Sequence, residues 1–161
     1  MKNKLALLGL LLTINISLRS QSIINTPTIN KYANVLSFDY CKNILNVPSG
    51  MGGQFSIGDK VMVIQMKGAT LNNNFDSDNG TVEDFASAGN YEINEIKTIN
   101  STVTDEIVLK FELTRSYNTS YSVQIVNIPQ YEDVEVQNTL TCQTWDGFTG
   151  GIIAFNASGT I

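Results

Sequence analysis

The residues of this sequence that could do chemistry are almost all carboxylates, because the chain contains no histidine. Its absence removes the usual general base near neutral pH, the serine–histidine pair and most zinc sites. The two cysteines, Cys41 and Cys142, therefore lack the partner base that cysteine catalysis requires. Carboxylate pairs for glycoside hydrolysis can be found in any acidic chain, and nothing in this one selects a pair. We therefore expect no catalytic residues and no enzyme activity.

Asp76 and Asp78 form the one acidic pattern that suggests a ligand. They alternate in the turn-forming stretch FDSDNG, and carboxylates spaced in this way can direct oxygen atoms at calcium. The pattern departs from the helix–loop–helix calcium motif, because its glycine comes one position early and no glutamate stands at the twelfth place. A solvated polar loop is the alternative reading of the same residues. Apart from this calcium candidate, we expect no cofactor.

Four aromatic residues, Trp145, Tyr91, Tyr121 and Tyr131, raise the question of sugar binding. Together they could form a platform on which a sugar ring stacks. Aromatic side chains at strand positions also fill cores. The sequence leaves both readings open.

The chain begins with a pattern typical of export. Lys2 and Lys4 precede an apolar run, and small or polar residues follow it in MKNKLALLGLLLTINISLRSQS. This order indicates a signal peptide at residues 1–22, with cleavage after Ser20 or Ser22. The apolar run is shorter than the roughly 20 residues of a membrane-spanning helix, so we expect no integral membrane segment after cleavage. The predicted location is extracellular or at the cell surface.

The charge of the exported part argues against two classes of partner. Cleavage leaves seven basic residues against 15 acidic ones, a net charge near −8. Nucleic acids are bound chiefly through lysine and arginine, and anionic membranes attract basic segments. We therefore expect neither as a partner.

Cys41 and Cys142 allow two interpretations in an oxidising compartment. A disulfide between them would close a loop of roughly 100 residues and stabilise the fold by about 4 kcal/mol through chain entropy. Alternatively, the two are separate, small buried side chains. Cys142 lies in phase with Val134, Val136 and Leu140, which favours a core position for it.

The elements that would position these residues are strands. After the signal segment, apolar residues recur at every second position, with turn-forming residues between the runs. A long polar stretch at 69–89 favours turns and loops. In 106–117, Ile107, Leu109, Phe111 and Leu113 should share one face. Near Asn94 and Glu95 the phase changes as at a bulge. The expected strands occupy 36–40, 58–68, 90–100, 106–117, 121–129, 131–142 and 150–161.

This pattern predicts an all-β fold in two parts. Residues 23–130 should form a small antiparallel β-barrel or sandwich, and a barrel is favoured because closure hides strand edges. Residues 131–161 resemble the first strands of a β-solenoid-like region, which buries its faces by stacking on further coils. In the last segment, Ile153, Phe155, Ala157 and Ile161 should point inward. We expect this region to be truncated, as part of a longer protein.

Several stretches together resemble the N-terminal region of large secreted surface proteins of Bacteroidota, which are described as gliding-motility-associated or adhesin-like. The stretches are FSIGDKVMVIQMKGA, AGNYEINEI, VQIVNIPQYEDVEV and LTCQTWDGFTGGIIAFNASGTI, in this order. The positions that match are Gly58, Asp59, Gly68, Ala88, Gly89, Tyr91, Glu92, Pro129, Tyr131, Trp145, Asp146, Gly147, Gly150, Gly151 and Gly159. The resemblance implies a modular surface or adhesion protein whose N-terminal region leads into β-rich repeats. It implies no catalytic residue.

The expected function is therefore that of a non-catalytic extracellular structural or adhesion module, the N-terminal part of a larger cell-surface protein. The alternative is a carbohydrate- or calcium-binding β-module that acts alone. The partner would be an extracellular glycan or protein, or another strand that pairs with the edge of the last strand.

Overall fold

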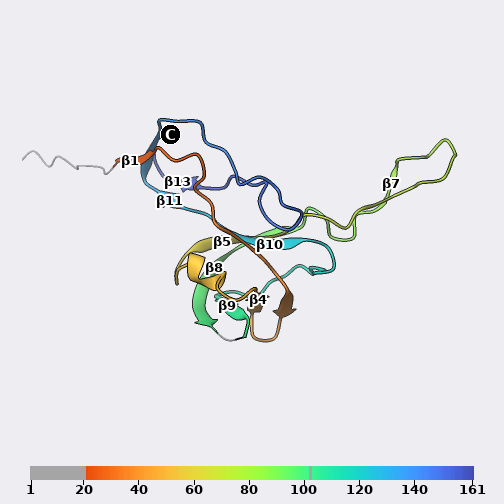
Figure 1. Cartoon of the computed structure of the whole chain (residues 1–161), viewed down its shortest axis with the longest axis horizontal. Helices are drawn as coiled ribbons and strands as arrows, with labels where there is room; N and C mark the ends of the chain where they lie inside the picture. Colours follow the sequence, from red (N-terminus) through yellow and green to blue (C-terminus); the bar gives the residue numbers. More distant parts are fainter. Residues whose placement is uncertain (1–20, 102) are drawn as a thin grey trace, which may run out of the picture.

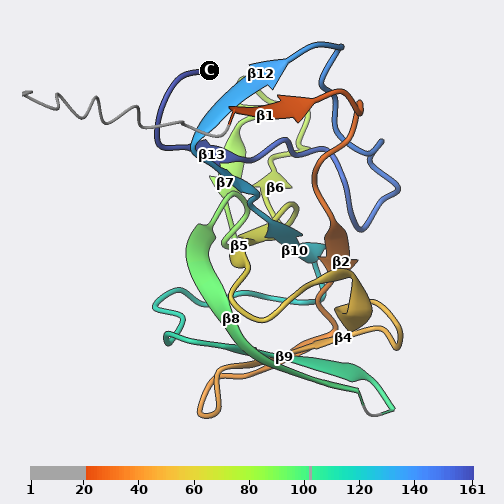
Figure 2. The same ribbon diagram turned by 90° about the vertical axis from the view of Figure 1, so that its left-hand side faces the viewer.

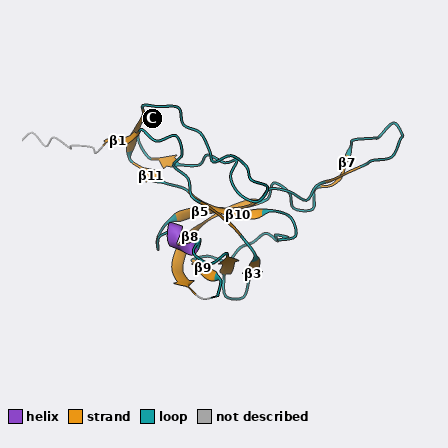
Figure 3. Ribbon diagram, viewed as in Figure 1, coloured by secondary structure: helices purple, strands orange, loops and turns teal. Residues whose placement is uncertain are grey.

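The computed structural model describes residues 21–101 and 103–161, and nearly all of the regular structure there is strand (Figure 3). The prediction of an all-β chain is therefore confirmed. The one helical element in this part of the chain is a short 3-10 turn, η1 (Gly52–Gln54). Of the predicted signal peptide at 1–22, residues 1–20 lie outside the described residues.

Seven strands form one large sheet, in which every neighbouring pair is antiparallel (Figure 2). The prediction of an antiparallel unit is confirmed to this extent. Across the sheet the strands are β2 (Tyr32–Asn34), β10 (Val123–Asn127), β5 (Lys60–Gln65), β8 (Tyr91–Ser101), β9 (Asp105–Leu109), β4 (Ile44–Val47) and β3 (Ser37–Asp39).

The two outer strands of this sheet, β2 and β3, are separated along the chain by Val35 and Leu36 only. The amide of Val35 donates to the carbonyl of Val123 at 2.8 Å, and the amide of Leu36 donates to the carbonyl of Asn46 at 2.8 Å. One continuous segment thus passes from β10 at one end of the sheet to β4 at the other end.

The core lies on one face of this sheet, where apolar side chains alternate with outward ones. In β5, for example, Val61, Val63 and Gln65 are fully buried while the residues between them are partly exposed. This alternation follows from the two-residue repeat of a strand. The core cluster consists of Ala33, Val35, Leu45, Val47, Phe55, Val61, Val63, Ile96, Ile107, Leu109, Tyr117, Val123 and Ile125.

A second, parallel layer combines the first described strand with the last segments of the chain (Figure 2). In it, β1 (Gln21–Ile24) pairs with β12 (Asp133–Val136), and β11 (Gln130–Tyr131) pairs with β13 (Asn156–Ala157). The amide of Gln137 donates to Ile24, whereas the amide of Val134 donates to Thr160. Residues 130–136 are therefore bonded on both sides, by 21–24 on one and by 156–160 on the other.

Buried amide side chains fasten the last segments to the antiparallel sheet. Gln124 of β10 forms two hydrogen bonds with Gly150, one to its carbonyl and one from its amide, both at 2.9 Å. Asn30 bonds to the backbone of Ala154 and to the carbonyl of Asn127. The Tyr32 hydroxyl donates to the carbonyl of Ile152. These contacts cover the outer face of β10, which is why all five of its residues are buried.

A hairpin built from β6 (Thr70–Leu71) and β7 (Val82–Asp84) extends far from the rest of the molecule (Figure 1). Its strands are short, and most of it is loop (Figure 3). It lies within the stretch 69–89 that the sequence predicts to be a long loop.

The predicted phase of the strand at 106–117 is wrong near its end. Strand β9 ends at Leu109, and Phe111 is 56% exposed instead of sharing the face of Ile107. The cause is the side chain of Asn94, which bonds to both the amide and the carbonyl of Phe111 and so takes the place of a ladder partner. The register shift in β8 lies between Ile96 and Thr98, just after the expected bulge.

The closing segment also differs from its predicted phase. Ile153 and Ile161 are exposed, while Phe155 and Ala157 are partly buried. Only Asn156–Ala157 is strand, because hydrogen bonds to the carbonyls of Ile152 and Ala154 hold the preceding residues outside a regular ladder.

Cys41 and Cys142 do not form a disulfide in this structure. Both are free; Cys41 is exposed and Cys142 is half-buried. The two thiols are therefore separate, as in the second interpretation, but neither side chain is buried.

Candidate functional site

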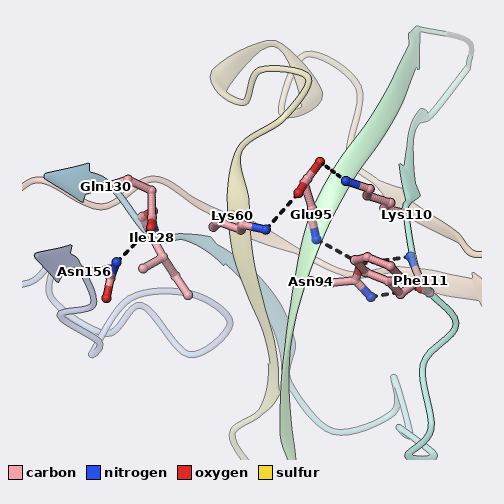
Figure 4. Close-up of polar contacts among 8 residues, drawn as sticks. All are labelled: Lys60, Asn94, Glu95, Lys110, Phe111, Ile128, Gln130 and Asn156. Carbon is pink, nitrogen blue, oxygen red and sulfur yellow. Dashed lines mark hydrogen bonds and ion pairs between the residues drawn. The ribbon is translucent and has the colours of Figure 1, made fainter. Parts of the chain in front are cut away.

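An open cavity of about 210 Å³ lies where the antiparallel sheet meets the parallel layer. Figure 4 shows its polar rim. On the layer side, the amide of Asn156 donates to the side-chain oxygen of Gln130 at 3.1 Å, and Gln130 donates to the carbonyl of Ile128 at 2.7 Å. On the sheet side, Lys60 and Ile93 complete the lining. The cavity is thus bounded by amides, two isoleucines and one lysine.

Glu95 lies between two lysines beside this cavity (Figure 4). Its carboxylate accepts hydrogen bonds from Lys60 and Lys110, each at 2.8 Å. Lys60 and Glu95 are also direct partners across the β5–β8 ladder. The hydrogen bonds from Lys110 and then Lys60 lower the pKa of Glu95 to about 2. Such a carboxylate stays ionised and paired at neutral pH, so it is suited to holding strands together and not to giving up a proton.

Glu92 forms a second polar centre on the same strand. It accepts bonds from the amides of Thr114 and Arg115, from the Thr114 hydroxyl and from the Tyr117 hydroxyl, at 2.7–3.2 Å. Partial burial raises the pKa of Glu92, but these hydrogen bonds outweigh it, and the pKa lies below its ordinary value. Burial, and then the charge of Glu92, raise the pKa of Tyr117. The carboxylate therefore fixes the loop at 114–117 onto β8.

The stretch WDGFTGG at 145–151, which is part of the resemblance described above, forms a tight turn that is held by the carboxylate of Asp146. Asp146 accepts bonds from the amides of Thr149 and Phe148 at 2.7 and 2.8 Å and from the Thr149 hydroxyl at 3.0 Å. The bonds from Thr149 and then Phe148 lower the pKa of Asp146. Lys67 donates to the carbonyl of Gly147 and lies 5.4 Å from the centre of the Trp145 ring. The role visible for these residues is structural.

The structure places Asp76 and Asp78 together at the end of the projecting hairpin. The amide of Asp78 donates to the carboxylate of Asp76 at 3.0 Å, and the Ser77 hydroxyl donates to that of Asp78 at 3.3 Å. Both residues are exposed. In the described part of the chain, no three residues of the types Asp, Glu, Cys and His are grouped as metal ligands. The calcium site stays a prediction.

The four aromatic residues considered for sugar stacking are not joined by any ring contact within residues 21–101 and 103–161. Tyr131 packs edge-on against Phe155, with ring centres 6.0 Å apart. Trp145 is covered by Lys67. Tyr91 is largely exposed on β8. The structure therefore does not bring these rings together as one platform.

The most strongly bonded polar residues, Asn94, Glu95 and Glu92, were not singled out as site residues from the sequence. The change of strand phase near Asn94 and Glu95 is a signal for these two residues. Glu92 has no such signal, since its partners at 114–117 lie in a segment that the pattern predicts to be strand.

No known protein family matches the chain, and a search of curated proteins finds no match either. Among the described residues, no helix has the length and apolar character needed to cross a membrane.

Proposed function

We propose that the chain is a non-catalytic extracellular adhesion and structural module, the N-terminal part of a larger cell-surface protein. The observation that carries this proposal is the projecting β6–β7 hairpin (Figure 1). Phe75 near its end is 104% exposed and Phe85 near its base is 66% exposed, and Leu71 and Val82 between them are exposed as well. An arm of this kind adds no core to its own fold.

The exposed apolar side chains support contact with a partner surface. Scattered apolar residues are normal on protein surfaces, but a group of large ones on one projecting element marks an interaction site. Burying one phenylalanine against a partner contributes about 1.5–3 kcal/mol. The hairpin is therefore the element through which we propose that the module adheres.

The non-catalytic part of the proposal is supported by the state of the carboxylates. Glu92, Glu95 and Asp146 each accept several hydrogen bonds from the protein itself, and their pKa values are lowered. A general acid at neutral pH needs a raised pKa instead.

The structural part of the proposal rests on the parallel layer. Residues 156–160 stack on 130–136 in the same direction, with partners such as Gln130 and Asn156 26 residues apart. Parallel stacking at such a spacing is how solenoid coils add to one another. We propose that this layer begins a β-solenoid-like region, and that the antiparallel sheet is a barrel joined by the continuous segment at 32–39.

Export remains part of the proposal, with cleavage after Ser20 or Ser22. Gln21 and Ser22 both pair with β12, which favours cleavage after Ser20. The resemblance to surface proteins of Bacteroidota stays a prediction that agrees with this role.

The experiment measures adsorption of the chain to an alkyl-coated sensor surface by the mass that it binds. The double variant Phe75→Ser, Phe85→Ser should weaken adsorption by at least about tenfold, because it removes two rings that become buried against the alkyl surface. Phe111→Ser is the matched control, since it removes an exposed phenylalanine outside the hairpin. Equal adsorption of the hairpin variant and the control would contradict the proposal.

Calorimetry separates this proposal from a stand-alone carbohydrate- or calcium-binding module. Titration of the chain with calcium chloride and with soluble glycans should show no binding in the micromolar range. Micromolar calcium binding that is lost in Asp76→Asn, Asp78→Asn would favour the alternative.

A further inference from the structure

The contact between the two ends of the antiparallel sheet stops partway along β2 and leaves an opening. The ladder between β3 and β4 pairs Ser37 with Asn46, and the amide of Leu36 still bonds to Asn46. Continued in register, this ladder would place Ser49 opposite Asn34. Instead the chain turns away at Pro48, whose carbonyl accepts a bond from the amide of Met51 at 3.0 Å. Proline also has no amide hydrogen to offer to a neighbouring strand.

The backbone of β2 presents free hydrogen-bonding groups to this opening. The carbonyl of Lys31 and the amide of Val35 bond to β10. Between them, successive residues direct their backbone groups alternately toward β10 and away from it. Tyr32 and Asn34 therefore occupy the positions whose amide and carbonyl groups point away from β10. Within the described residues, no hydrogen bond outside the ladder reaches the backbone of either residue.

The opening contains a cavity of about 300 Å³, which we call the seam cavity. Met51 and Phe148 are exposed apolar side chains in its lining, and Asp146 adds one negative charge. The carboxylate of Asp146 is ionised, because hydrogen bonds from Thr149 and Phe148 lower its pKa. The residues lining the seam cavity are Tyr32, Ala33, Asn34, Pro48, Met51, Asp146, Phe148 and Thr149.

We propose that the seam cavity binds an extended peptide segment of another protein, which adds a short strand to β2 and places one apolar side chain between Met51 and Phe148. An unpaired strand edge specifies an extended backbone, and an adjacent pocket selects a side chain. The negative charge of Asp146 and the net charge of −5 on the whole chain favour a peptide with basic residues beside the apolar one. This site goes beyond the proposed adhesion through the hairpin, and none of its residues belongs to β6 or β7.

The test records the amide resonances of the isotope-labelled chain during titration with a short probe peptide. The peptide alternates threonine and valine around a central leucine and carries lysine at both ends. It should shift the amide of Asn34 and protect it from hydrogen exchange at concentrations up to about 1 mM. The same peptide with one backbone N-methyl group facing β2 should bind about two- to tenfold more weakly, because one hydrogen bond is lost. Replacing its lysines by glutamates should also weaken binding, and added salt should reduce that difference.

Variants of the chain provide a second test of the same site. Asn34→Pro removes the amide hydrogen that points into the seam cavity, together with the asparagine side chain, and an edge strand tolerates a proline at such a position. It should weaken peptide binding about two- to tenfold, whereas Asn34→Ala keeps the amide and should bind like the wild type. Phe148→Ala should weaken binding of the leucine peptide more than binding of a peptide with central glycine. Phe75→Ser should leave peptide binding unchanged.

Three results would overturn the proposal. One is the absence of any shift at Asn34 with the unmethylated lysine peptide. Another is equal binding of the methylated and unmethylated peptides, which would show that no strand is added. The third is a shift at Asn34 that appears with chain concentration alone or with free sugars such as glucose and mannose, since the opening would then serve self-association or sugar binding.

Discussion

At the scale of single residues, the polar contacts of β8 make the fold sensitive to acid. Glu95 is held between Lys60 and Lys110, and Glu92 is held by the loop at 114–117. Both carboxylates have lowered pKa values. A carboxyl group whose pKa is lower in the folded than in the unfolded chain binds fewer protons when folded, and protonation then favours unfolding.

The first prediction concerns Glu95, whose pKa falls from an ordinary 4.5 to about 2. Its contribution to the free energy of unfolding is complete above pH 4.5 and should be lost as the pH falls from 4.5 to about 2. Urea unfolding of the wild type should therefore show a steeper loss of stability in this window than unfolding of Glu95→Gln. Glu83→Gln, a change at an exposed residue of β7, should behave like the wild type. Equal slopes for the wild type and Glu95→Gln would contradict the ion-pair geometry.

Sequence reasoning at this scale succeeded where a side chain only has to follow the strand repeat. Ile107 and Leu109 are buried as their alternation predicts. It failed at Phe111, because the side chain of Asn94 replaces a ladder partner there and ends the strand. A side chain that bonds to a distant backbone leaves no periodic signal in the sequence.

At the scale of elements, the unexpected feature is β1, which lies beside β12 in parallel. Each residue of β1 pairs with one of β12, from Gln21 with Asp133 to Ile24 with Val136. Ile24 is 4% exposed, whereas its neighbour Ile23 is 55% exposed. The strand therefore anchors the parallel layer through one buried side chain.

The second prediction tests this anchor. Ile24→Ala should lower the free energy of unfolding by about 2–4 kcal/mol, because it leaves a cavity in a buried position. Ile23→Ala, the matched control, should change it by less than about 0.5 kcal/mol. Hydrogen exchange adds a local readout, since the amide of Gln137 bonds to Ile24 and should exchange faster in Ile24→Ala. Equal effects of the two substitutions would contradict the placement of β1.

The pairing of β1 could not be predicted from the sequence. A two-residue repeat indicates which face of a strand is buried, but it carries no information on which distant strand lies alongside. The central strands β5 and β10 are predictable because their apolar runs are long and end in turn residues. The hairpin is predictable only as a long polar stretch, because its strands β6 and β7 are too short for a periodic signal.

At the scale of the whole molecule, two differently built parts share one chain. The antiparallel sheet has a core of its own, and the parallel layer is fastened to it through Asn30, Tyr32 and Gln124. The hairpin extends away from both parts (Figure 1). We propose that the parallel layer stacks on further coils, that the hairpin adheres to a partner surface and that the seam cavity binds an extended peptide.

Contact through the hairpin is the central claim, and a fluorescent reporter at its end tests it most directly. Phe75→Trp is made in a chain that also carries Trp145→Phe, so that the only tryptophan lies at position 75. When this chain binds alkyl-coated particles, its emission should shift to shorter wavelengths, because the ring leaves water. A matched chain with Phe111→Trp in the same background should bind without a shift. Binding that leaves the emission at position 75 unchanged and shifts it at position 111 would contradict adhesion through the hairpin.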